Sequence, residues 1–160
     1  MKTLLAILFT ATLTTLTFGQ KDTSKYVLAI KQVKNEKTAQ KTFWIVSTTV
    51  TNNSNETLKY LSMSCSWQEF YYVDNNKMSI DVGVCTKNGP IIVNLAPNES
   101  VNKEIKLQIK QDNGGFNKIK FKIGMNLLQV KNENTTSQLY DEFLKDKFMK
   151  NIIWSNSIEM

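Results

Sequence analysis

The chain has 160 residues and a formal net charge of +6 at pH 7, and all of its basic side chains are lysines, with no arginine or histidine. Arginine is the side chain that forks onto phosphates and guanine edges, so its absence argues against a nucleic-acid partner. The absence of histidine excludes a Ser-His-Asp triad, a Cys-His pair and a histidine-based zinc site. Two cysteines cannot build a four-thiolate site, so no metal or cofactor is predicted.

Residues 1–19 have the layout of a signal peptide. Lys2 precedes an apolar run from Leu4 to Phe9, and threonine-rich small residues lead on to Gly19. The run is too short to span a bilayer. We therefore expect cleavage after Gly19 and a single mature domain, residues 20–160, which is exported to the periplasm or the extracellular space and does not span a membrane.

From Lys25 onward, apolar and polar residues alternate with a period of two, which is typical of half-buried strands. The first two strands are predicted from Tyr26 to Val33 and from Thr42 to Val50, followed by a turn-forming cluster over 51–57. A third strand is predicted from about Leu58 to Val73. Its solvent face would carry Ser62, Ser64, Ser66 and Gln68, and its core face Leu61, Met63, Cys65, Trp67, Tyr71 and Val73.

Shorter strands follow. We predict them over 78–85, 91–95, 101–109, 116–128 and 152–160, with a hairpin turn at Asn88-Gly89. One segment has helical spacing instead, and a helix of two or three turns with Ser137 as N-cap is predicted there. Its apolar face would be formed by Leu139, Tyr140, Phe143, Leu144 and Phe148.

This pattern predicts an all-β fold, an antiparallel sandwich of about seven or eight strands with one short helix before the last strand. A closed barrel is the main alternative, because alternation alone does not distinguish the two. The order of elements resembles bacterial exported immunoglobulin-like β-sandwich accessory domains. The resemblance is carried by three stretches, VTNNSNETLKYLSM (50–63), VNLAPNESVNKEIKL (93–107) and IIWSNSIEM (152–160).

The middle stretch departs from the family pattern at one position. Asn98 replaces the glycine usual in that turn, and asparagine also tolerates positive φ. The resemblance implies a fold and no particular activity, although some similar domains inhibit proteases.

Cys65 and Cys85 are the only cysteines. A reactive thiol at Cys65 would lack a histidine partner to form the thiolate. An even pair in an exported domain is normally a disulfide, and closing a loop of about 20 residues would stabilise the fold by roughly 3 kcal/mol.

Several side chains are candidates for binding. If the strands over 101–109 and 116–128 pair, a cationic patch would form, able to attract an anionic glycan, lipid headgroups or an acidic protein. Its lysines would be Lys106, Lys110, Lys118, Lys120 and Lys122. The alternative is a solvated sheet face whose lysines prevent edge-to-edge aggregation. Phe70 and Tyr72 share the serine-rich face of their strand and are predicted to be exposed.

Four N-x-S/T sequons begin at Asn52, Asn55, Asn98 and Asn134, and we interpret them as chance in an asparagine-rich bacterial protein. No two carboxylates are placed across a cleft, so an enzyme is not expected. The sequence favours a non-catalytic binding or accessory role with an unknown protein or an anionic glycan as partner. A protease-inhibitor-like domain presenting the loop DNNK (74–77) or TKNGP (86–90) is the alternative. The sequence leaves the oligomeric state open.

Overall fold

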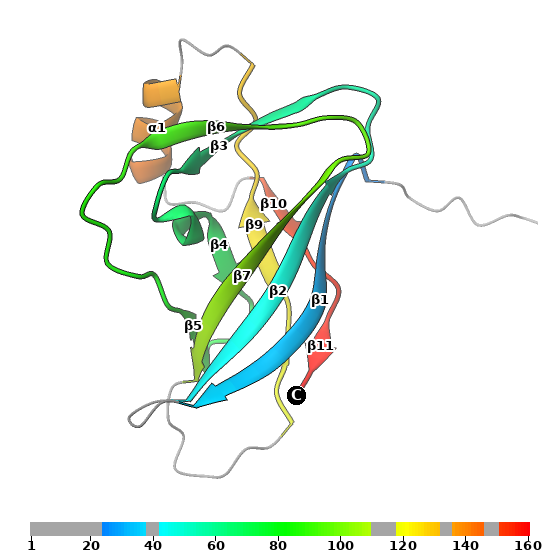
Figure 1. The fold of residues 1–160 in the computed structure, drawn as a ribbon, viewed down its shortest axis with the longest axis vertical. Helices are drawn as coiled ribbons and strands as arrows, with labels where there is room; N and C mark the ends of the chain where they lie inside the picture. The colour runs from blue at the N-terminus through cyan, green and yellow to red at the C-terminus, as the bar shows by residue number, and fades with distance from the viewer. Residues whose placement is uncertain (1–23, 38–41, 110–117, 132–135, 146–150) are drawn as a thin grey trace, which may run out of the picture.

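The structure is a computed structural model that describes residues 24–37, 42–109, 118–131, 136–145 and 151–160. The predicted signal peptide, Lys110, Asn134 and Phe148 lie outside these ranges. Within them the protein is mostly β, with eleven strands, one short α-helix near the C-terminus and one 3-10 turn (Figure 1). No helix in the described part of the chain has the length and apolar character needed to cross a membrane.

Four strands form an antiparallel sheet in the order β1-β2-β7-β5. They are β1 (Tyr26–Lys37), β2 (Thr42–Asn52), β7 (Ser100–Ile109) and β5 (Met78–Ile80). The predicted alternation holds along β7, where Ile105 and Leu107 are buried between exposed residues, whereas β2 buries consecutive residues such as Ile45 and Val46. β1 has a bulge between Ile30 and Gln32, where the Ile30 N–H donates to the side-chain oxygen of Asn156, 2.7 Å away.

The remaining strands form three smaller antiparallel sheets. These pair β3 (Leu58–Met63) with β6 (Pro90–Leu95), β9 (Ile123–Asn126) with β4 (Tyr71–Val73) and β10 (Ile152–Trp154), and β8 (Lys120–Phe121) with β11 (Ile158–Glu159). The chain beyond β9 continues alongside β3, where the Leu61 N–H donates to the Leu128 carbonyl and the Val130 N–H to the Lys59 carbonyl.

The core is a single cluster to which the four-stranded sheet and the smaller sheets both contribute. Leu28, Val46 and Leu107 enter it from the first, and Leu61 and Ile123 from the others. The helix α1 (Thr136–Lys145) lies beside β3 and β6 (Figure 1) and buries Phe143. It begins at Thr136, so the prediction of Ser137 as N-cap is wrong.

The structure has more strands than predicted because three predicted strands are each divided in two. The predicted strands over 58–73, 116–128 and 152–160 each contain a non-strand break within their described residues. In the first, the chain bends at Ser64 and Cys65 and then forms the 3-10 turn η1 (Trp67–Phe70). A 3-10 turn repeats every three residues, so the period-two faces predicted there are lost.

Two other local predictions have different outcomes. The prediction of a hairpin at Asn88-Gly89 is wrong. β6 pairs with β3 and not with β5, which is the strand that precedes β6 in the chain. The turn at Asn98 is as expected: its φ is 62°, the one positive value for a non-glycine residue in the described ranges. Asparagine adopts this left-handed conformation more readily than other side chains with a Cβ.

Candidate binding site

Cys65 and Cys85 form the predicted disulfide, with their Cα atoms 6.0 Å apart, within the range that a disulfide bridges. Cys65 is exposed, so its predicted place on a core face is wrong. Hydrogen bonds reinforce the link: the side-chain oxygen of Asn88 accepts from the N–H groups of Cys65 and Ser66. The chain between β5 and β6 is thus fixed to the segment before η1. A disulfide of this kind indicates an oxidising compartment.

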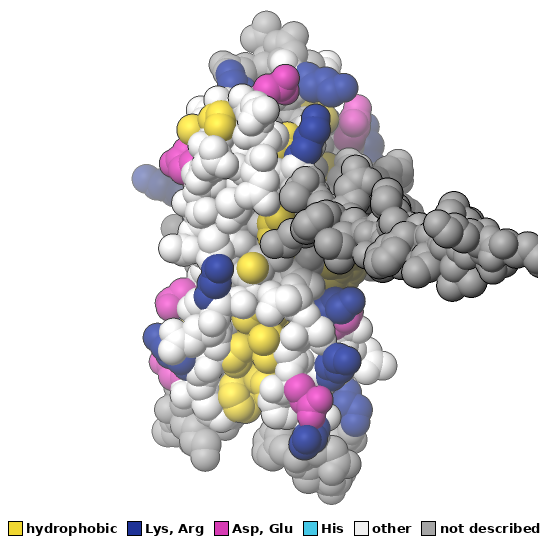
Figure 2. Space-filling view, turned by 90° about the vertical axis from the view of Figure 1, so that its right-hand side faces the viewer, with side chains coloured by type: hydrophobic (Ala, Val, Ile, Leu, Met, Phe, Trp, Pro, Cys, Tyr) yellow, Lys and Arg dark blue, Asp and Glu magenta, His cyan; other side chains and the backbone are white. Residues whose placement is uncertain are grey.

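The predicted lysine patch does not form by strand pairing, because β7 pairs with β2 and β5 while β8 pairs with β11. The lysines lie next to acids: Lys106 Nζ is 3.9 Å from Glu36 Oε2, and Lys118 Nζ is 3.1 Å from Glu159 Oε1. Lys120 lies opposite Glu159 in the ladder, and the Lys122 N–H donates to Asp74. Figure 2 shows acidic and basic side chains interspersed on one face of the molecule. Lys110 is outside the described residues.

The two aromatic candidates have different outcomes. Phe70 is 1% exposed, so its predicted exposure is wrong. Its ring stacks on Phe143 of α1, with the centroids 4.5 Å apart. Tyr72 is half-buried within β4, opposite Gly124. Trp67 packs edge-on against Tyr71 and lies under the ammonium of Lys103, so this aromatic group contributes to packing.

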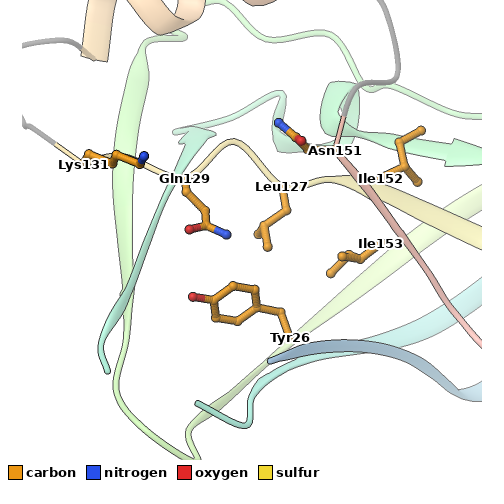
Figure 3. Close-up of a pocket in the computed structure, with 7 residues that line it drawn as sticks. All are labelled: Tyr26, Leu127, Gln129, Lys131, Asn151, Ile152 and Ile153. Atoms are coloured by element: carbon orange, nitrogen blue, oxygen red, sulfur yellow. The ribbon is translucent and has the colours of Figure 1, made fainter. Parts of the chain in front are cut away.

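The structure contains a hollow of about 480 Å³ that none of the predicted site residues lines. It is lined by Tyr26, Leu127, Gln129, Lys131, Asn151, Ile152 and Ile153 (Figure 3). Its volume is within the usual range for small-ligand pockets. The lining combines an apolar floor, one aromatic ring, two amides and one ammonium, which provides donors, acceptors and a positive charge.

Backbone pairing fixes the walls of this hollow. Along the segment that follows β9, Gln129 and Lys131 are exposed, whereas Leu127 and Val130 are buried and belong to the core cluster. β3 holds this segment by the Val130 N–H, and on its other side the Leu127 N–H donates to the Asn151 carbonyl at 3.0 Å. In Figure 3 the side chains of Leu127 and Gln129 extend toward the ring of Tyr26 at the start of β1.

Sequence reasoning missed this site for a physical reason. Its residues come from three separate segments, and none of them forms a motif with its neighbours in the chain. The pairing of β10 with β9, and the return of the chain along β3, bring them together. No spacing within the sequence carries that information.

The chain matches no protein-family model and no curated protein. Solved structures similar to it include the following two. A FixG-related protein from Vibrio parahaemolyticus has 12% sequence identity and a TM-score of 0.37, over 86% of this chain and 95% of that chain. The yjhA protein from Bacillus subtilis has 12% identity and a TM-score of 0.39, over 82% of this chain and 90% of that chain. Neither similarity bears on what this chain binds.

Proposed function

We propose that this chain is a small exported immunoglobulin-like β-sandwich with a non-catalytic binding role, and that an anionic glycan occupies the hollow beside β10. The sandwich is supported by the single core that the four-stranded sheet shares with the smaller sheets. Export is supported by the signal-peptide layout of residues 1–19 and by the disulfide.

The observation that carries the ligand class is the chemistry of the hollow. The ring of Tyr26 offers an apolar face and a hydroxyl, which suits the mixed surface of a sugar. Gln129 and Asn151 add amide donors and acceptors, and Lys131 supplies the positive charge. The seven lining residues include no carboxylate, which favours binding over glycoside hydrolysis, a reaction that ordinarily requires two.

An array of neutral and acidic glycans tests this proposal. We expect the mature protein to retain acidic glycans, with retention weakened by salt. Tyr26→Ala and Lys131→Gln should each reduce retention at least tenfold. Lys145→Gln on the exposed part of α1 is the matched control, since it removes the same charge away from the hollow. An array with no retained glycan, or equal effects of Lys131→Gln and Lys145→Gln, would overturn the proposal.

A second candidate, protease inhibition through TKNGP (86–90), is favoured by the fixed flanks of that loop. Cys85 is held by the disulfide, and Asn88 by hydrogen bonds to the backbone of Cys65 and Ser66. Such preorganisation lowers the entropic cost of docking into a partner's cleft. Stoichiometric inhibition of an extracellular protease, lost in Lys87→Ala, would support it, and failure across a broad protease panel would exclude it.

A further inference from the structure

The four-stranded sheet ends at β5, and its edge continues into an unusual segment. The Asp81 N–H still donates to the Lys106 carbonyl of β7, 2.8 Å away. From Asp81 to Cys85 the chain then runs without helix, turn or bend. In Figure 1 the connection from β5 to β6 forms the left-hand margin of the molecule.

This segment exposes two apolar side chains beyond Asp81. Val82 is 42% exposed and Val84 is 99% exposed, and a Cβ built on Gly83 would have no neighbour within 4 Å. Native edge strands are usually protected by lysine, proline or a bulge, because an unprotected edge is a template for strand pairing. In a strand conformation, two valines at alternate positions would lie on the same face.

Both ends of the segment are fixed. The hydrogen bond to Lys106 holds Asp81, and the disulfide to Cys65 holds Cys85. These two links restrict the conformations of the segment before any partner arrives, which lowers the entropic cost of pairing. A segment that continues a sheet edge, is exposed and is fixed at both ends is suited to receiving another strand.

We propose that Asp81–Cys85 pairs antiparallel with the same segment of a second copy, about a two-fold axis at Gly83. Alternate residues of a strand turn their backbone groups to opposite sides. Because the Asp81 N–H points to β7, the groups of Val82 and Val84 point outward. The two-fold axis brings Val82 of each copy opposite Val84 of the other, and each such pair exchanges two hydrogen bonds.

The segment is self-complementary, which identifies a second copy as the partner. The valines are placed symmetrically about Gly83, so the apolar faces match in this register. In this register Asp81 of one copy lies opposite Cys85 of the other copy. Lys87 follows Cys85 by two residues, so opposite charges lie near each other at both ends of the ladder. A ladder this short buries less surface than a permanent dimer needs, so the dimer is reversible.

Gly83→Cys tests this register directly. Facing residues of a pair without mutual hydrogen bonds have Cα atoms about 4.5 Å apart, within the range that a disulfide bridges. We expect most of the Gly83→Cys protein to form a covalent dimer on air oxidation, with Cys65–Cys85 intact by disulfide mapping. Gly89→Cys is the matched control, since a Cβ there also has no neighbour within 4 Å, and it should stay monomeric.

Sedimentation equilibrium provides a second measurement that needs no added cysteine. The wild type should show a concentration-dependent monomer–dimer equilibrium, and Val84→Lys should weaken it at least tenfold. Ile91→Lys, at a position 41% exposed on β6, should leave it unchanged. The proposal is overturned if the wild type is monomeric at every concentration, if the two lysine variants behave alike, or if Gly83→Cys and Gly89→Cys cross-link equally.

Discussion

Phe70 and Phe143 stack with their ring centroids 4.5 Å apart and their planes 17° apart. Phe70 belongs to η1 and Phe143 to α1, and their exposed fractions are 1% and 8%. The pair joins the only α-helix in the described ranges to the β core, so the position of α1 depends on it.

Replacing Phe143 with alanine should therefore detach α1 from the core. We expect the free energy of unfolding to fall by about 3–5 kcal/mol, the usual cost of truncating a buried phenylalanine. Leu144→Ala is the matched control, because Leu144 on the same helix is 44% exposed. Urea denaturation measures the free energy of unfolding of both variants. Equal losses of stability in the two variants would mean that the stacked pair does not hold the helix.

Removing the disulfide by Cys65→Ser with Cys85→Ser should lower stability by about 3 kcal/mol, the chain-entropy value for a loop of this length. The sequence separation is 20 residues. Urea denaturation of the wild type with and without reductant should give the same difference. Non-reducing mass analysis should find a mass two hydrogens below that of the dithiol, and a thiol alkylated under native conditions would contradict the pairing.

Asn52 is fully buried and makes hydrogen bonds with both ends of its amide. Its Nδ2 donates to the carbonyls of Glu56 and Leu95, and its Oδ1 accepts from the backbone and hydroxyl of Ser54. Asn52 begins a sequon, but its amide nitrogen is not available to a glycan in the folded chain. Asn55 and Asn98 are exposed.

Asn52→Ala should cost at least about 3 kcal/mol, because each buried group left without a partner costs about 1–3 kcal/mol. Asn53→Ala, at an exposed neighbouring position, should be close to neutral. Thermal unfolding monitored by circular dichroism compares the two variants. A small effect of Asn52→Ala would show that water replaces the lost amide.

Much of the fold could be predicted because the long strands obey a period of two. β7 has this pattern along most of its length, and its register with β2 places Ile105 opposite Val46 in the core. The prediction fails where a local feature overrides alternation. Around Cys65 the chain bends, and η1 buries Phe70 and exposes the cysteine.

Pairing between strands was harder to predict than the strands themselves. The Asn88-Gly89 signal indicates a hairpin, but in the structure the Asn88 side chain binds the backbone of Ser66, and β6 pairs with β3. The predicted lysine patch likewise required β7 to pair with β8, but β7 pairs with β2 and β5, and β8 pairs with β11. The hollow around Tyr26 needed long-range pairing to exist at all, so local sequence gave no signal for it.

Two buried tyrosines predict a loss of stability at alkaline pH. Burial raises the pKa of Tyr60 from 10.0 to about 12, and burial together with the charge of Tyr60 raises the pKa of Tyr71. Below pH 10 both the folded and the unfolded chain keep the protons of these two tyrosines, so the buried tyrosines contribute fully to the free energy of unfolding. Above it the unfolded chain binds fewer protons, so the free energy of unfolding falls as pH rises toward about 12.

Tyr60→Phe with Tyr71→Phe should reduce this fall by roughly 2–3 kcal/mol or more, since two pKa units correspond to about 2.7 kcal/mol. Urea denaturation at a series of alkaline pH values measures it. Comparison with the wild type cancels the titration of the lysines, which both proteins share. An unchanged slope in the double variant would contradict the assignment, and Tyr72→Phe, at a half-buried position, is the control.

Gly124 lies opposite Trp154 where β9 pairs with β10. A Cβ there would lie 2.8 Å from Ile152 Cγ2 and from the ring of Trp154, closer than atoms pack in proteins. Gly124→Ala should therefore lower the free energy of unfolding by about 1–3 kcal/mol, the usual cost of overpacking. Gly89→Ala is the control, because a Cβ there has no neighbour within 4 Å. Adding Trp154→Ala should restore part of the loss, since it removes the ring that the new methyl group meets, and no recovery in a double-mutant cycle would place the strain at Ile152 instead.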